Sequence, residues 1–164
     1  MSKKKKTPSI IKTESTFEIF EAVKSDLKAL TQLFDAYRQF YRQKSDLQGA
    51  KAFLEDRLKF KDSVIFIAIN EKGNAIGFTQ LYPLFSSVSM KRTWLLNDLF
   101  VDPGFRGLGV SKELIERSKQ LARETNAKGL QLETEKTNSV GLKLYPSAGF
   151  ELESGSNFYF WKYS

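Results

Sequence analysis

The chain has 164 residues, of which 41% are hydrophobic, and this size and composition are those of one ordinary folded domain. It contains neither cysteine nor histidine, which excludes disulfides, thiolate nucleophiles, imidazole bases and the usual zinc ligands. Any catalysis must therefore use carboxylates, phenols, amines, hydroxyls or backbone dipoles, and we expect no metal.

The net charge of +7 is concentrated at the N-terminus, where five of the 26 basic residues are lysines within the first thirteen positions. The rest of the chain sets 21 basic against 19 acidic residues and is nearly balanced. We therefore expect a disordered basic tail over residues 1–15, a single domain over residues 16–164, and no nucleic-acid partner. No apolar run approaches the roughly 20 residues that cross a bilayer, so we expect no membrane partner and a cytoplasmic location.

The first half of the domain mixes strand-forming runs with two amphipathic segments. Leu27, Leu30 and Phe34 recur at helical spacing, and Asp46 is an N-cap candidate for a second helix. Gly73 lies in a turn between two strand-forming runs and predicts a hairpin. The predicted elements are, in order, a strand at 16–23, helices at 27–43 and 46–60, and a meander of strands at 63–70, 75–85 and 93–101.

The second half predicts a long helix, followed by shorter elements. Leu114, Ile115 and Leu121 share one face of a helix over residues 111–125. A short strand at 127–134, a helix capped by Thr137 or Asn138, and two strands at 149–154 and 157–164 complete the order. This order predicts an α/β fold with a mixed sheet and helices on its faces. The last strand is rich in aromatic residues, and as an exposed sheet edge it would favour a homodimer.

A glycine-rich turn joins the third meander strand to the long helix, within residues 101–115. Gly104, Gly107 and Gly109 allow close approach of a ligand to backbone N–H groups at the helix N-terminus, where Arg106 adds a positive charge. A pyrophosphate fits such a site. A turn that uses glycine only for backbone freedom fits the glycines equally well. A dinucleotide fingerprint does not match their spacing, and a Walker loop is excluded because no Gly-Lys-Ser/Thr follows.

The same stretch resembles the GNAT superfamily of N-acetyltransferases, whose signature is Gln/Arg-x-x-Gly-x-Gly/Ala. The match is Arg106-x-x-Gly109-x-Ser111, in which Ser111 replaces the usual Gly or Ala. A second family feature follows, with Asn138 and then the sequence LYPSAGF at residues 144–150. The resemblance extends over nearly all of residues 16–164 and implies a mixed, mostly antiparallel central sheet with helices on both faces.

The resemblance implies acetyl-CoA as the acetyl donor, with its pyrophosphate on the glycine turn. Its pantetheine arm would lie along the end of the preceding strand, where two strands separate. The residues that the resemblance assigns to the cofactor are Leu99, Phe100, Val101, Arg106, Gly107, Leu108, Gly109, Val110, Ser111, Lys112 and Asn138.

Acetyl transfer needs a neutral amine and a proton for the departing thiolate, and without cysteine a direct attack by the amine is favoured. Tyr145 matches the family's general acid, although its spacing alone is typical of a core aromatic. The base is less clear, because polyamine acetyltransferases have Glu-Asp where this chain has Asn97-Asp98, and an amide accepts no proton at neutral pH. Asp98 is the candidate base, with a structural carboxylate, an anchor for a substrate ammonium group, and solvent as base remaining open.

The candidate acceptor site contains Tyr37, Phe40, Tyr41 and Asn97, because the first helix borders the acceptor in this family and aromatic faces hold cationic amines. The same stretches resemble the branch with histone and D-amino-acid acetyltransferases and the polyamine and thialysine enzymes. We expect an N-acetyltransferase acting on the primary amine of a small molecule, such as a polyamine, an amino acid or a lysine-like compound. The alternatives are a protein-lysine or N-terminal acetyltransferase and a non-catalytic acyl-CoA sensor, the last favoured by Asn97.

Overall fold

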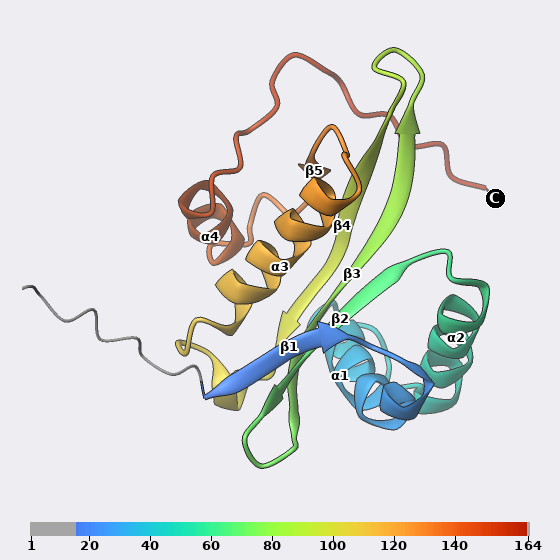
Figure 1. Cartoon of the computed structure of the whole chain (residues 1–164), viewed down its shortest axis with the longest axis vertical. Helices are drawn as coiled ribbons and strands as arrows, with labels where there is room; N and C mark the ends of the chain where they lie inside the picture. The colour runs from blue at the N-terminus through green and yellow to red at the C-terminus, as the bar shows by residue number, and fades with distance from the viewer. Residues whose placement is uncertain (1–15, 164) are drawn as a thin grey trace, which may run out of the picture.

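The computed structural model describes residues 16–163, so the predicted basic tail at residues 1–15 lies outside the described residues (Figure 1). Five strands form one sheet in the order β1-β2-β3-β4-β5, and every pair is antiparallel except β4 and β5. This confirms the predicted mixed, mostly antiparallel sheet. The elements are β1 Phe17–Glu21, α1 Leu27–Phe40, α2 Leu47–Phe60, β2 Val64–Asn70, β3 Ala75–Ser86, β4 Lys91–Val101, α3 Val110–Glu124, β5 Leu130–Gln131 and α4 Gly141–Ser147, with 3-10 turns η1 Lys24–Asp26 and η2 Pro103–Phe105.

Local signals in the sequence account for several boundaries. The Asp46 side chain accepts a hydrogen bond from the Gly49 N–H and caps α2, as predicted. Gly73 has a φ of 78° and forms the turn of the β2–β3 hairpin. The N-cap position of α4 is Val140, and the Asn138 side chain, one of the two predicted caps, accepts a hydrogen bond from the N–H of Gly141, the first residue of the helix, at 3.0 Å. The helices and the meander of strands therefore follow the sequence pattern closely.

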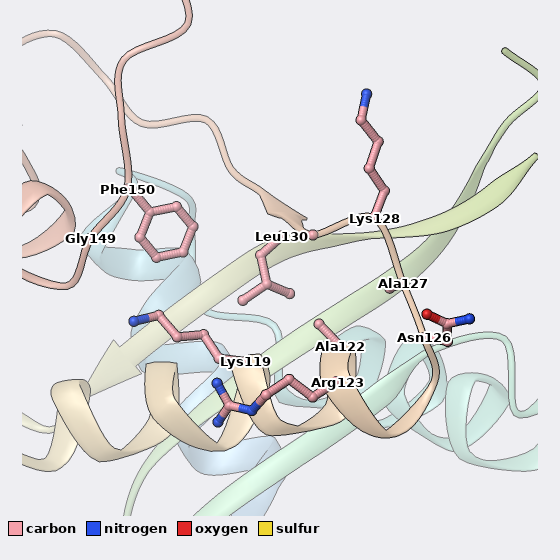
Figure 2. Close-up of a pocket in the computed structure, with 10 residues that line it drawn as sticks. Lys119, Ala122, Arg123, Asn126, Ala127, Lys128, Leu130, Gly149 and Phe150 are labelled. Atoms are coloured by element: carbon pink, nitrogen blue, oxygen red, sulfur yellow. The ribbon is translucent and has the colours of Figure 1, made fainter. Parts of the chain in front are cut away.

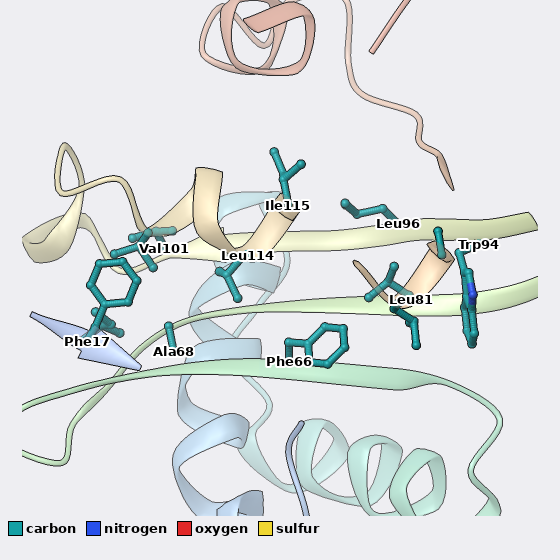
Figure 3. Packing of buried hydrophobic residues seen from close by; sticks show 13 residues of the cluster. Phe17, Phe66, Ala68, Leu81, Trp94, Leu96, Val101, Leu114 and Ile115 are labelled. Atoms are coloured by element: carbon teal, nitrogen blue, oxygen red, sulfur yellow. The ribbon is translucent and has the colours of Figure 1, made fainter. Parts of the chain in front are cut away.

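Helices cover both faces of the sheet, with α1 and α2 on one face and α3 and α4 on the other (Figure 1). On the α3 face, Leu114 and Ile115 of α3 belong to the same buried cluster as Phe66 of β2 and Leu81 of β3 (Figure 3). On the α1 face, Leu30 and neighbouring residues pack on Ile65, Ile67, Phe78 and Phe100. Full burial of such a side chain stabilises the fold by about 1.5–3 kcal/mol.

A β-bulge in β4 changes the face toward which this strand directs its side chains. Gln80 lies opposite Asp98 and Leu81 lies opposite Leu96, so Asn97 is an extra residue without a partner in β3. Leu96 therefore packs with the α3 face, whereas Phe100, four residues later, packs with the α1 face. Because alternate residues share a face, the bulge places Asp98 on the α1 side together with Phe100.

The prediction of two C-terminal strands at 149–154 and 157–164 is wrong for the described part of the segment. Residues 149–163 contain no strand, and every side chain from 151 to 163 is exposed. A strand requires a partner backbone, and the neighbouring β5 is only two residues long, shorter than the predicted 127–134. The segment is therefore not a sheet edge, and the sheet ends at β1 and β5. Within residues 16–163, no helix combines the length and apolarity that spanning a membrane requires.

Candidate active site

A cavity of about 240 Å³ lies between the end of α1, the end of β4, the glycine turn and α4. The turn leads directly into α3, so the cavity opens at the N-terminus of that helix. Leu108 and Lys112, both predicted to bind the cofactor, are exposed and do not line it. The lining residues are Phe40, Tyr41, Leu99, Phe100, Val101, Phe105, Arg106, Gly107, Gly109, Val110, Ser111, Asn138, Val140, Gly141, Leu144 and Tyr145.

The glycine turn has the geometry of an anion site. Gly107 and Gly109 have φ values of 80° and 84°, in the left-handed region that glycine adopts without steric cost, and Gly109 is the N-cap of α3. Beside either glycine, the space that a Cβ would occupy is open. The Lys112 N–H donates to the Gly109 carbonyl, so the N–H groups without helical partners lie before it. The positive end of the helix dipole adds to their attraction for a phosphate.

Arg106 is held in place beside this turn. Its Nε donates a hydrogen bond to the Val101 carbonyl at 3.1 Å. Its guanidinium carbon lies 5.8 Å from the ring centre of Phe40 and 5.9 Å from that of Phe100. The terminal nitrogens remain as donors for an anion, since the backbone contact uses only Nε. Phe40, predicted to border the acceptor, thus lines the cavity between Arg106 and Tyr41.

Gly77 of β3 determines how closely the cavity floor can pack, and it belongs to none of the motifs in the sequence. A Cβ at this position would lie 2.9 Å from the Phe100 carbonyl oxygen and 3.3 Å from side-chain atoms of Val101 and Val110. No side chain larger than hydrogen fits without movement of β4 or α3. A glycine inside a strand pattern often marks such a close approach, so the position of Gly77 within a strand-forming run is the feature that could have predicted it.

The C-terminal end of β4, next to the cavity, has one edge without a neighbouring strand among the described residues. The parallel pairing with β5 involves only Trp94 and Leu95, so the two strands separate before Leu99. Leu99, Phe100 and Val101 line the cavity beyond that point. An extended ligand can therefore reach unpaired main-chain groups of β4 without displacing a strand, as the predicted separation of two strands requires.

Tyr145 and Asn138 enter the cavity from the α4 side. The Tyr145 ring packs against Phe150 with 5.9 Å between centroids, and burial raises the pKa of its hydroxyl, with a smaller contribution from Tyr41. Tyr145 is thus a neutral phenol, a proton donor, at physiological pH. The Asn138 amide donates to the Thr134 hydroxyl at 2.9 Å while its oxygen accepts from the Gly141 N–H, so its side chain is already engaged at the start of α4.

Asp98 is a buried carboxylate, 5% exposed, on the α1 side of β4. Burial raises its pKa above the ordinary value, and hydrogen bonds from Asn97 and Tyr37 oppose that rise. The Asn97 amide lies 3.1 Å from both carboxylate oxygens. Burial and the nearby Asp98 together raise the pKa of Tyr37 well above its usual range. Asn97 and Tyr37 thus act directly on the candidate base.

The end of α1 forms the remaining wall. The Tyr41 ring packs edge-on against Tyr37, 5.1 Å between centroids. Burial, Glu135 and Asp98 raise the pKa of its hydroxyl, and Tyr41 in turn contributes to the raised pKa of Tyr145. Arg42 follows with a φ of 64°, and its guanidinium forms an ion pair of 2.7 Å with Glu135, three residues before Asn138. This pair links the α1 and α4 sides beside Tyr41, and no local sequence pattern predicts it.

The fold and this site together define an acyltransferase that uses a phosphate-bearing donor. The acetyltransferase (GNAT) family matches residues 28–150, about three quarters of the chain, and the chain belongs to this family. It is 52% identical over 137 residues to the "Uncharacterized N-acetyltransferase YhfO" of Bacillus subtilis, which covers 84% of this chain and 91% of that relative. The protein is an N-acetyltransferase, and enzymes of this family use acetyl-CoA.

Solved structures show the same fold. A crystal structure described as "a probable acetyltransferase" has a TM-score of 0.86 and 39% identity, covering 90% of this chain and 98% of that one. The aminoglycoside N-acetyltransferase AAC(6')-Iy in complex with CoA has a TM-score of 0.75, covering 93% and 99% of the two chains. At 23% identity, this second likeness concerns the fold alone.

Proposed function

We propose that this enzyme transfers the acetyl group of acetyl-CoA directly to a primary amine of a small molecule. The observation that carries the proposal is one cavity lined by both an anion-binding turn and Tyr145, in which the wall residue Tyr41 interacts electrostatically with the buried Asp98 behind it. Acetyl-CoA supplies a thioester-activated acetyl group together with a pyrophosphate. The glycine turn matches the pyrophosphate, the free edge of β4 matches the pantetheine arm, and the Tyr145 hydroxyl matches the thioester sulfur.

Donor binding rests on backbone groups more than on side chains. The N–H groups around Gly107 to Ser111 and the fixed charge of Arg106 hold the pyrophosphate. Main-chain groups of Leu99 to Val101 hold the pantetheine arm, and Asn138 keeps α4 against it. Leu108 contributes its backbone alone, because its side chain is exposed.

Acetyl transfer requires one group that accepts a proton from the amine and a second group that donates a proton to the departing sulfur. Asp98, with a raised pKa and a buried position, accepts a proton from the acceptor ammonium group, directly or through water. The neutral Tyr145 hydroxyl donates a proton to the sulfur as the C–S bond breaks, and it regains one from solvent afterwards. Tyr37 and Asn97 keep the carboxylate oriented through their hydrogen bonds.

The Arg42–Glu135 ion pair favours a small acceptor over a protein substrate. A polypeptide would need an open groove past Tyr41, whereas this pair connects the two walls at that point. The aromatic rings of Tyr37 and Tyr41 provide faces for a cationic amine, as in the polyamine and thialysine branch that the sequence resembles. The pair is exposed and stabilises the connection between the two walls by at most about 1 kcal/mol, so the preference that it gives for a small acceptor is modest.

The test is release of free thiol from acetyl-CoA in the presence of polyamines, lysine analogues, D- and L-amino acids, aminoglycosides and a lysine-containing peptide. The chain has no cysteine, so the enzyme contributes no thiol signal. We expect release with one class of small primary amine, and a product heavier by one acetyl group. Release with the peptide alone would favour a protein acceptor, and binding of acetyl-CoA without release for any amine would favour the acyl-CoA sensor.

A further inference from the structure

Asp35 of α1 is, besides Asp98, the other buried carboxylate among the described residues, and it is only 3% exposed. The Asp46 N–H donates a hydrogen bond to its Oδ1 at 2.8 Å, and the Ser45 hydroxyl donates to its Oδ2 at 2.7 Å. Gln39, one turn further along α1, donates to Oδ2 at 2.9 Å. The Asp35 side chain thus ties the residues just before α2 back to the middle of α1.

Arg38 reinforces this tie from the next turn of α1. Its guanidinium lies 3.6 Å from the Asp35 Oδ1 and donates to the Lys44 carbonyl at 3.4 Å. Burial opposes the ionisation of Asp35, but its hydrogen bonds and the charge of Arg38 together hold the pKa of this carboxyl below its ordinary value. Hydrogen bonds to an ionised carboxylate are stronger than those between neutral groups, so residues 44–46 are fixed firmly to α1.

The turn between α1 and these fixed residues has a strained backbone at Arg42, whose φ is 64°. The Arg42 N–H donates to the Gln39 carbonyl at 2.9 Å, and the Gln43 N–H donates to the Arg38 carbonyl at 3.0 Å. This pair of bonds ends a helix through a left-handed residue, which is usually glycine. An arginine keeps that conformation only where the surrounding structure holds it, and Asp35 fixes the chain on the downstream side.

We propose that Asp35 is a positioning residue for the acceptor side of the active site, because it fixes residues 44–46 and so holds Arg42 where it reaches Glu135. This role rests on the proposed function, in which the Arg42–Glu135 pair closes the cavity beside Tyr41. Asp35 does not line the cavity, so it acts through the turn alone. Without the tie, the turn relaxes, and Tyr41, the residue before Arg42, loses its fixed position beside the amine.

Asp35→Ala removes every hydrogen bond that the carboxylate accepts, so the turn should open more often. We expect exchange of the Asp46, Arg42 and Gln43 amide hydrogens to be about tenfold faster than in the parent. The KM for the best small amine should rise about two- to tenfold. Because the glycine turn and α4 are untouched, kcat and the dissociation constant of acetyl-CoA should stay within about twofold of the parent values.

Two milder variants separate positioning from loss of folding. Asp35→Asn keeps a carbonyl oxygen for the Asp46 N–H, so it should return KM to within about twofold of the parent value. Ser45→Ala removes one of the bonds at an exposed residue, which keeps the test available if Asp35→Ala does not fold. It should raise both the exchange rate at Asp46 and KM, by about two- to threefold.

Glu116→Ala is the matched control, with the same change of charge on the other face of the sheet. Glu116 accepts a hydrogen bond from Arg123 at 3.0 Å and pairs with Lys119, and both basic residues lie beside the hollow of about 500 Å³ that Figure 2 shows. This variant should leave KM and the exchange of the turn unchanged. In an Arg42→Ala background, Asp35→Ala should raise KM no further, since the residue through which it acts is gone.

Unchanged exchange at Asp46 in Asp35→Ala would overturn the proposal, because the turn would then be held without the carboxylate. Faster exchange with an unchanged KM, an equal rise of KM in Glu116→Ala, or additive effects of Asp35→Ala and Arg42→Ala on KM would also overturn it, while acetyl transfer itself would stand. A parent enzyme that acetylates no amine would instead contradict the proposed function, and the role of Asp35 with it.

Discussion

The hydroxyl of Tyr37, on α1, faces the carboxylate of Asp98, on β4, as a hydrogen-bond donor that lowers the pKa of this carboxylate. This bond stabilises the ionised carboxylate, the form that accepts a proton, and therefore opposes the pKa rise that burial causes. Tyr37→Phe should raise the pKa of Asp98 further, so the acid limb of kcat/KM should move to higher pH by about one unit. The measurement is the pH profile of thiol release for both proteins.

Tyr82→Phe is the control for this profile. Tyr82 is also half-buried near Asp98, and burial and that carboxylate raise its pKa to about 12, with Arg57 opposing the rise, but its hydroxyl does not act on the Asp98 pKa. Removal of the Tyr82 hydroxyl should leave the acid limb of the kcat/KM profile at the same pH. An unchanged limb in Tyr37→Phe, with normal acetyl-CoA binding, would show that Asp98 is not the base.

Asp98→Asn should reduce turnover and stabilise the fold at neutral pH. Because burial raises the folded-state pKa of Asp98 above its unfolded value, the folded protein binds more protons, and this contribution to stability is lost as the pH rises through the folded pKa. At pH 7 the variant avoids the cost of a buried charge, on the order of 1 kcal/mol in the free energy of unfolding. Urea unfolding at pH 7 and pH 4 checks this, and the difference should shrink at pH 4. A variant less stable than the parent at pH 7 would instead assign Asp98 a structural role.

Gly77→Ala should weaken both the fold and acetyl-CoA binding. Its Cβ would meet the Phe100 carbonyl oxygen at 2.9 Å, so β4 or the start of α3 must move, at a cost of about 1–3 kcal/mol. Denaturant unfolding and calorimetric titration with acetyl-CoA measure the two effects. Gly129→Ala is the matched control, since its Cβ would meet no atom within 4 Å, and it should bind like the parent. Equal behaviour of the two variants would contradict the close approach.

Arg42→Glu should widen the range of acceptors. Reversal of this charge replaces the ion pair with Glu135 by a repulsion beside Tyr41, and the gap between the α1 and α4 sides should open. The ratio of kcat/KM for a lysine peptide to that for the preferred small amine should rise up to about fivefold. Arg42→Glu/Glu135→Arg restores opposite charges and should restore the ratio. A ratio that is the same in all three proteins would show that the pair does not select the acceptor.

The sequence predicted the features that depend on local chemistry. The Asp46 cap, the turn at Gly73 and the helical spacing of Leu27, Leu30 and Phe34 each act within a few residues, and the structure has the corresponding elements. The glycine turn and Tyr145 were placed by family motifs, and the structure brings them to one cavity.

Features that depend on tertiary contacts were not predicted. The bulge at Asn97 follows only from the register between β3 and β4, because the sequence of one strand does not show which of its residues lacks a partner in the next strand. The Arg42–Glu135 pair joins residues 93 positions apart. The C-terminal segment has the composition of a strand, yet strand formation requires a partner edge that its own sheet does not give it in this structure.

The most direct test of the central claim compares steady-state acetyl transfer by the parent enzyme and by Tyr145→Phe, with the best amine from the panel. If the Tyr145 hydroxyl donates the proton to the departing sulfur, kcat should fall by about 10²–10⁴-fold while the dissociation constant of acetyl-CoA stays nearly constant. Tyr82→Phe should remain near the parent value. A Tyr145→Phe enzyme with undiminished kcat would contradict the assignment of this cavity's proton donor.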